Sequence, residues 1–206
     1  MALHHRASTS GRRRGQRFDA DANVVTESLI FLGELDPEAI GEAMEDATHY
    51  EPTPLGEFEA FAKAIPEPLD RFTLYDIGAG MGRVVLLATR FAFKQIVGVE
   101  VSPALCAVAR DNVVRWRRQF DELACKDVRI KCGDAASSPL PAGPLAVYLF
   151  NPFGERTLAR FAQRLKTHAA DVYVLYHTPV HRHVFDEDPA FESVAQTAVG
   201  AVYRKR

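Results

Sequence analysis

The chain has 206 residues, of which 47% are hydrophobic and 25% are charged, and its formal net charge at pH 7 is -2. These values are ordinary for a soluble globular protein with one buried core, and they give no overall basic excess for a large nucleic-acid surface. No apolar run approaches the roughly 18 residues that a membrane-spanning helix needs. The three cysteines lack C-x-x-C spacing, which indicates reduced thiols and favours a cytoplasmic location.

Residues 1–25 differ in composition from the rest of the chain. No acidic residue precedes Asp19, and five arginines occur among the first 17 residues. Such a segment cannot bury enough apolar surface to fold on its own, so we predict a disordered basic tail. It lacks the apolar region of a secretory signal, and the alternatives are a transit peptide or a nucleic-acid-binding arm.

Helical patterns follow over residues 26–66, which we predict to be an N-terminal helical extension. Asp36 and Thr53 each precede a proline, which is typical of an N-cap followed by the first helical position. The first of these helices is expected to reach residue 47, and the second to reach residue 65.

The remaining residues, 67–206, alternate short apolar runs with helical patterns. The runs are continuous and lack a period of two, which is typical of parallel strands buried on both faces. We therefore predict an α/β domain with a mostly parallel seven-stranded sheet and helices on both faces. The expected strands are 72–77, 96–101, 128–132, 145–150, 172–176, 191–194 and 199–203. The expected helices are 84–93, a long helix that begins at Pro103, and 155–169.

The first expected strand ends in D-I-G-A-G-M-G-R, residues 76–83. Ligands of parallel sheets bind beyond the carboxyl ends of the strands, and glycines there let the backbone approach a nucleoside closely. Arg83 occupies the place of the third glycine in the dinucleotide-binding fingerprint. Asp76 would repel a pyrophosphate, since like charges repel at short range. Both residues favour a ligand that contains a sulfonium or an ammonium group.

Acidic residues also follow the next two strands. Glu100 comes 24 residues after Asp76, and a carboxylate at this place can accept hydrogen bonds from both ribose hydroxyls. Asp134 follows the third strand in G-D-A, where an acid can accept a hydrogen bond from the exocyclic amine of adenine. The structural alternatives are a solvated loop charge for Glu100 and a turn-forming residue for Asp134.

The motifs D-I-G-A-G-M-G, V-G-V-E and G-D-A, on successive strands, resemble the S-adenosylmethionine site of class I methyltransferases. The resemblance covers roughly residues 50–180 and implies the Rossmann-like fold of that family. The stretches G-R-V-V-L-L-A, V-E-V-S-P and L-F-N-P-F-G are similar to small bacterial methyltransferases whose substrates are mostly unassigned. The implied cofactor is S-adenosylmethionine, with S-adenosylhomocysteine as its product.

The resemblance also implies a role for individual residues. Glu100 is expected at the ribose and Asp134 near the adenine. The lead-in segment H-Y-E-P-T-P is expected to fold over the cofactor, so Tyr50 and Thr53 are expected to line its site. Helix capping by Thr53 is the alternative. The residues expected around the methionyl part are Asp76, Gly78, Ala79, Gly80 and Gly82.

The fourth strand ends in F-N-P-F-G, at the place that faces the transferred methyl group in this family. The Asn151 carbonyl can accept a hydrogen bond from a target N–H, and Phe153 can stack on a planar acceptor. Many nitrogen methyltransferases have two prolines in this motif and this chain has one, so a plain Asn-Pro turn is the alternative. His177, after the fifth strand, is the candidate base by position, with an ordinary hydrogen-bonded histidine as the alternative. We expect no metal site.

The sequence therefore predicts a cytoplasmic S-adenosylmethionine-dependent methyltransferase, of general class EC 2.1.1, with a nitrogen nucleophile as the favoured acceptor. A small-molecule or protein substrate is favoured over nucleic acid because no basic face stands out beyond the tail. No membrane partner is expected. Two alternatives stay open, an NAD-type nucleotide-dependent oxidoreductase and a non-catalytic, methyltransferase-like binding module.

Overall fold

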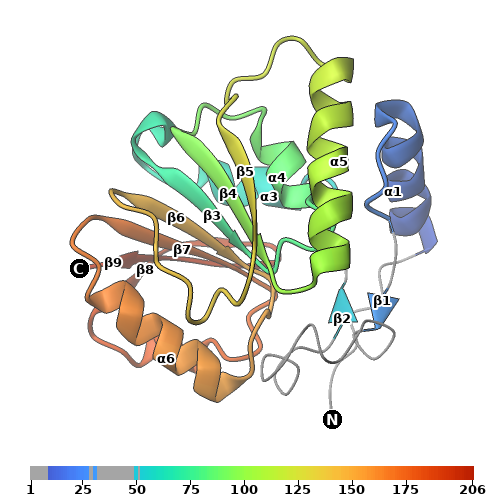
Figure 1. Ribbon diagram of the computed structural model, residues 1–206. Helices are drawn as coiled ribbons and strands as arrows, with labels where there is room; N and C mark the ends of the chain where they lie inside the picture. The colour runs from blue at the N-terminus through green and yellow to red at the C-terminus, as the bar shows by residue number, and fades with distance from the viewer. Residues whose placement is uncertain (1–8, 28–29, 32–48, 51) are drawn as a thin grey trace.

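The computed structural model describes residues 9–27, 30–31, 49–50 and 52–206. Its centre is a seven-stranded sheet in the order β5-β4-β3-β6-β7-β9-β8 (Figure 1). β8 (Phe191–Thr197) and β9 (Gly200–Lys205) are antiparallel and follow β7 at one edge. The predicted, mostly parallel α/β sheet is therefore confirmed. Its parallel strands are β3 (Thr73–Ile77), β4 (Gln95–Glu100), β5 (Val128–Cys132), β6 (Leu145–Leu149) and β7 (Val172–His177).

Helices cover both faces of this sheet (Figure 1). In β3, Leu74 packs into the cluster on one face and Tyr75 into the cluster on the other. Because both faces are buried, both sets of alternating side chains must be apolar, which explains the continuous runs. One face is covered by α3 (Glu57–Lys63), α4 (Arg83–Ala88) and α5 (Pro103–Gln119). The other is covered by α6 (Glu155–Lys166) and α7 (His183–Asp186).

The start of α5 follows its sequence signal. Ser102 Oγ accepts a hydrogen bond from the Leu105 N–H at 3.3 Å, and a proline occupies the first turn. Near the other end of α5, the buried Trp116 Nε1 donates to Thr89 Oγ1 at 2.9 Å. Thr89 is also the C-cap of α4, so α4 ends at Ala88 and is shorter than the helix expected over 84–93.

The N-terminal part differs from the prediction. α1 (Thr9–Ala22) is helical, although its composition predicts a disordered tail. The Phe18 ring lies 5.5 Å from the Trp116 ring, so α1 gains from α5 the apolar contact that its own sequence cannot provide. β1 (Ile30–Phe31) pairs antiparallel with β2 (His49–Tyr50). The helix expected over 36–47 lies outside the described residues.

Thr53 does not cap a helix. α3 begins at Glu57, after Gly56 in the left-handed conformation with φ of 92°. Thr53 Oγ1 lies 3.0 Å from the Tyr148 hydroxyl instead, inside the protein. A short 3-10 helix, η3 (Leu69–Arg71), then leads into β3.

The strand order reverses at β3, with β4 and β5 on one side of it and β6 and β7 on the other. Such a switch point leaves a crevice beyond the carboxyl ends of the strands, where ligands bind. The residues that follow β3, β4 and β6 are therefore the ones that the fold brings to one place.

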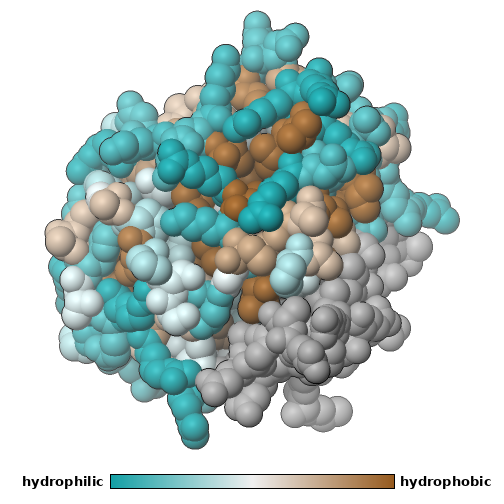
Figure 2. Space-filling view, viewed as in Figure 1, coloured by the Kyte–Doolittle hydropathy of each residue, from teal (hydrophilic) through white to brown (hydrophobic). Residues whose placement is uncertain are grey.

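The face of the molecule that carries α1 and α5 is mixed in character. Hydrophilic residues cover most of it, and hydrophobic residues show between them without forming one broad patch (Figure 2). Among the described helices, none combines the length and the apolar character that a membrane span requires.

Candidate cofactor-binding site

The glycine-rich turn, residues 78–82, connects β3 to α4. The N–H groups of Gly78 and Ala79 both donate to Val99 O at 2.9 Å, which holds the turn against β4. A Cβ atom on Gly78 would lie 3.2 Å from Pro152 Cβ, so the turn also passes close to the loop after β6. Positive φ values favour glycine because it has no Cβ. These values are 72°, 53° and 86° at Gly78, Gly80 and Gly82.

Glu100, at the end of β4, fixes the turn from the inside. Its Oε2 accepts a hydrogen bond from the Gly80 N–H and its Oε1 accepts one from the Ser102 N–H, both at 2.9 Å. Burial raises the pKa of Glu100, and these backbone hydrogen bonds oppose that rise. Each carboxylate oxygen has a further lone pair, so Glu100 can still accept hydrogen bonds from a ligand.

Asp76, one residue before the end of β3, is a buried acidic group of the site. It is 3% exposed, and its Oδ2 has no hydrogen-bond partner among the described residues. Burial raises the pKa of Asp76 to about 8, and the negative charge of Glu100 adds to the rise. A buried oxygen without a partner is costly, and such perturbed groups are typical of binding sites. A cationic ligand group would supply the missing partner.

Tyr148 of β6 is the register partner of Asp76 in the neighbouring strand. Its hydroxyl pairs with Thr53 Oγ1, and burial raises the pKa of Tyr148 well above its ordinary value. The sequence pattern did not identify Tyr148 as a site residue, because a tyrosine within an apolar strand is predicted to be part of the hydrophobic core. For Tyr50, also expected at this site, the described structure is its backbone in β2.

Asp134 shapes the loop after β5, two strands away from β3. Its Oδ1 accepts a hydrogen bond from the Ala136 N–H and its Oδ2 accepts one from the Ser137 hydroxyl, both at 2.8 Å. Arg164 of α6 fixes the same loop by donating to its backbone carbonyls, those of Ala135, Ala136 and Ser138. Asp134 thus has the turn-forming role given as its alternative, with lone pairs left for a ligand.

Asn151 joins the loops after β6 and β7. Its Nδ2 donates to Thr178 O at 2.7 Å, and its Oδ1 accepts a hydrogen bond from the Val180 N–H at 3.2 Å. Asn151 and Thr178 both have positive φ, 46° and 44°, a strained conformation that is enriched at functional sites. Phe153, two residues on, packs its ring 5.5 Å from that of Phe161 in α6.

His177, the last residue of β7, is buried and has a partner at each ring nitrogen. Its Nε2 lies 2.6 Å from Glu57 Oε2, and its Nδ1 lies 3.0 Å from Thr178 Oγ1. As a base, His177 would first have to give up one of these contacts. The pairing with Glu57 of α3 has no signal in the sequence. Within the described ranges, no group of three or more acidic, histidine or cysteine side chains is arranged to hold a metal ion.

A family model for a methyltransferase domain matches residues 75–151. The matched stretch includes the glycine-rich turn, Glu100 and Asp134, and it ends at Asn151. No curated protein sequence matches the chain.

Solved structures with the same fold are distant in sequence. An RNA methyltransferase from Salinibacter ruber, in complex with S-adenosyl-L-homocysteine, is 20% identical with a TM-score of 0.52, over 75% of this chain and 92% of that one. A SAM-dependent methyltransferase from Aquifex aeolicus is 14% identical with a TM-score of 0.51, over 72% and 87%. A precorrin 8w decarboxylase from Methanobacterium thermoautotrophicum is 16% identical with a TM-score of 0.51, over 76% and 92%. Residues 75–151 therefore resemble a methyltransferase domain, and the chain has the fold of these S-adenosylmethionine-dependent methyltransferases.

Proposed function

We propose that this protein binds S-adenosylmethionine and transfers its methyl group to a nitrogen nucleophile of a small molecule or a protein. The observation that supports this most strongly is the buried Asp76 Oδ2 without a hydrogen-bond partner, beside the negative charge of Glu100. The negative charge of Glu100 repels a pyrophosphate, and a cationic ligand group favours the ionised form of the buried Asp76 carboxyl. S-adenosylmethionine is a nucleoside that contains both a sulfonium and an ammonium group, so the residues present fit it.

The assignment of residues to parts of the cofactor follows the strand ends. Asp76 and the turn 78–82 would hold the methionyl part, Glu100 the ribose, and Asp134 the adenine. Lone pairs remain on both Glu100 oxygens after their bonds to backbone N–H groups, which is what acceptance from two ribose hydroxyls requires. Thr53 would contribute to the cofactor site through its contact with Tyr148. Tyr50 would contribute as part of the lead-in segment H-Y-E-P-T-P.

When bound, S-adenosylmethionine supplies a methyl group on a positively charged sulfur, which is a good leaving group. The task of the chain is then to align a neutral nucleophile with that methyl group, an effect worth up to several kcal/mol. Asn151 is placed for this because its amide already holds the loops after β6 and β7 together. Its Oδ1 keeps a second lone pair for a target N–H. Phe153 would contribute one wall of the acceptor site.

The location that we propose is cytoplasmic. All three cysteines, Cys106, Cys125 and Cys132, are free thiols, which supports a reducing compartment.

Calorimetric titration of the full chain tests the proposal. We expect S-adenosylmethionine and S-adenosylhomocysteine to bind with dissociation constants in the micromolar range, which corresponds to a binding free energy of about -8 kcal/mol. NAD should give no binding heat. Tight NAD binding without binding of either methionine compound would establish the oxidoreductase alternative instead. Transfer of labelled methyl groups to separate small-molecule, protein and RNA fractions then identifies the acceptor class. Binding without transfer to any of the fractions would indicate the non-catalytic module.

Substitution of Asn151 tests the acceptor side of the site. Asn151→Ala is expected to change the affinity for S-adenosylhomocysteine by no more than about twofold. It is expected to lower methyl transfer roughly fivefold or more, since a hydrogen bond to an oriented acceptor is worth about 1 kcal/mol or more. Calorimetry and the labelled-methyl assay measure the two effects. Asn151→Gly is the control, because glycine tolerates the positive φ but lacks the amide. Equal loss of cofactor binding in both variants would move Asn151 to the cofactor side.

A further inference from the structure

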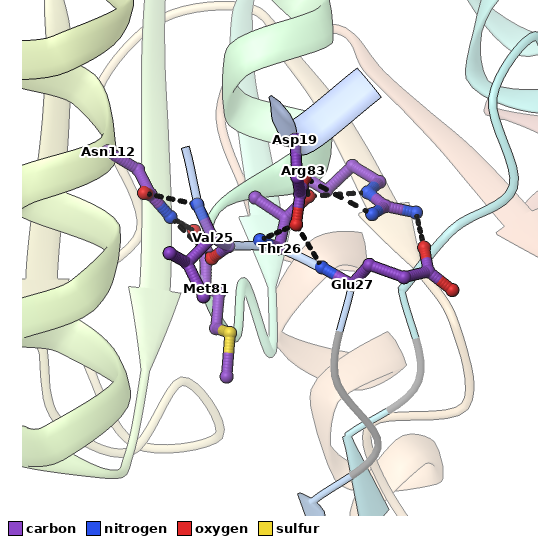
Figure 3. Close-up of polar contacts among 7 residues, drawn as sticks. All are labelled: Asp19, Val25, Thr26, Glu27, Met81, Arg83 and Asn112. Atoms are coloured by element: carbon purple, nitrogen blue, oxygen red, sulfur yellow. Dashed lines mark hydrogen bonds and ion pairs between the residues drawn. The ribbon is translucent and has the colours of Figure 1, made fainter. Parts of the chain in front are cut away.

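A single amide joins the N-terminal segment, residues 19–27, to the glycine-rich turn (Figure 3). Asn112 of α5 donates from Nδ2 to Met81 O in the turn at 2.9 Å and to Val25 O in the N-terminal segment at 2.8 Å. Its Oδ1 accepts a hydrogen bond from the Val25 N–H at 2.9 Å. Asn112 is 1% exposed, so its amide lies away from water, and its bond to Met81 O is hard to replace there.

Arg83, directly after the turn, is the second connection (Figure 3). It is 3% exposed, and its Nη1 lies 2.7 Å from Glu27 Oε2. Its Nε donates to Thr26 Oγ1 at 2.8 Å, and its Nη2 lies 3.6 Å from Asp19 Oδ1. A guanidinium is always charged, and a buried charge is stable only when it is paired. The N-terminal segment thus provides the counter-charges for the residue that begins α4.

Contacts within the N-terminal segment hold the Glu27 side chain next to Arg83. Asp19 Oδ2 accepts hydrogen bonds from the N–H groups of Thr26 and Glu27, both at 2.6 Å, so the segment folds back along α1. A Cβ atom on Gly15 would lie 1.7 Å from Glu27 Oε2. Glycine at this position therefore gives the Glu27 side chain its path past α1 to the guanidinium.

We propose that docking of the N-terminal segment and binding of the cofactor are coupled, with Asn112 and Arg83 as positioning residues. The turn has three glycines at positive φ, so its own backbone preference defines it weakly. Glu100 holds it on the inner side through the Gly80 N–H, and Asn112 holds it on the outer side through Met81 O. This inference rests on the proposed function, since the coupled ligand is the cofactor of the turn.

Coupling of this kind is reciprocal. A ligand that binds the ordered turn more tightly than the loosened turn favours the docked segment, and the docked segment favours the ligand by the same factor. Two independent measurements must therefore give the same coupling factor. The first is the factor by which bound cofactor slows hydrogen exchange in the N-terminal segment. The second is the factor by which cofactor affinity falls when the segment is released.

Hydrogen exchange on the full chain, with and without S-adenosylhomocysteine, measures the first factor at the amides of Val25, Thr26 and Glu27. We expect the bound cofactor to slow their exchange at least tenfold. Asn112→Ala is expected to speed exchange of these amides in the free protein and to weaken S-adenosylhomocysteine binding by a factor similar to that protection. Val114→Ala is the matched control, because Val114 lies on the same helix and is 46% exposed, and it should change neither quantity.

Arg83→Lys provides a second variant if Asn112→Ala does not fold. Lysine keeps the charge but lacks the planar guanidinium that reaches several partners at once. We therefore expect the same two changes, faster exchange of the segment amides and weaker binding of S-adenosylhomocysteine. Wild-type affinity in a folded variant whose segment exchanges freely would overturn the coupling and leave the proposed function intact. A wild-type chain that binds neither S-adenosylmethionine nor S-adenosylhomocysteine would overturn the proposed function, and the coupling with it.

Discussion

Replacing Asp76 with asparagine is expected to leave the fold at least as stable as the wild type at pH 7 while weakening S-adenosylmethionine binding. Burial raises the pKa of Asp76 to about 8, so the free protein holds this side chain protonated at pH 7. Asparagine has the same shape and no charge to bury. A hydrogen bond between a charged carboxylate and a cation is worth about 1.5–3 kcal/mol, which corresponds to an affinity loss of roughly 10- to 100-fold.

The raised pKa of Asp76 also predicts how the stability of the wild type changes with pH. Between the ordinary carboxyl pKa near 4 and the folded value of about 8, the folded state keeps a proton that the unfolded state has lost. The free energy of unfolding of the wild type should therefore fall as pH rises through this window, by about 1.4 kcal/mol per pH unit from this group. Above pH 8 both states are ionised and this slope disappears.

Cofactor binding should show the opposite dependence on pH. A bound cation favours the ionised form of Asp76, so wild-type affinity should increase as pH rises towards 8, by at most about tenfold per pH unit. Urea unfolding and calorimetry over pH 5–9, on the wild type and Asp76→Asn, measure both curves. The asparagine variant should lose both contributions. An unchanged affinity in Asp76→Asn would remove Asp76 from the cofactor site.

Glu100→Ala is expected to reduce both stability and cofactor affinity. The Glu100 carboxylate accepts hydrogen bonds from the N–H groups of Gly80 and Ser102. Alanine leaves both groups buried without a partner, at about 1–3 kcal/mol each. It also removes the acceptor proposed for two ribose hydroxyls and the anchor of the turn, so we expect an affinity loss of roughly 100-fold or more.

Glu100→Gln separates these contributions, since it keeps one carbonyl acceptor and removes the charge. We expect a smaller loss of stability than in Glu100→Ala and a lower pKa for Asp76, because the charge of Glu100 helps to raise it. Denaturant unfolding gives the stability and calorimetry gives the affinity for S-adenosylhomocysteine. If Glu100→Ala loses stability but keeps wild-type affinity, Glu100 serves the turn alone.

Local sequence patterns predict the sheet and the glycine-rich turn. Continuous apolar runs specify strands buried on both faces, and the parallel order brings Asp76, Gly78 and Glu100 to one edge. The long helix α5 also begins at Pro103, as predicted. These features depend on local spacing, on backbone conformations that favour glycine, and on a general rule about strand ends. None of them requires knowledge of a distant contact.

The pairing of polar side chains, in contrast, depends on contacts between residues far apart in the chain. Thr53 pairs with Tyr148 across 95 residues, Val25 with Asn112 across 87, and His177 with Glu57 across 120. α1 folds although its composition predicts disorder, because its apolar partner belongs to α5. No local pattern encodes such pairs. A buried polar group needs a partner with the right geometry, and only the packing of the whole chain determines which residue provides it.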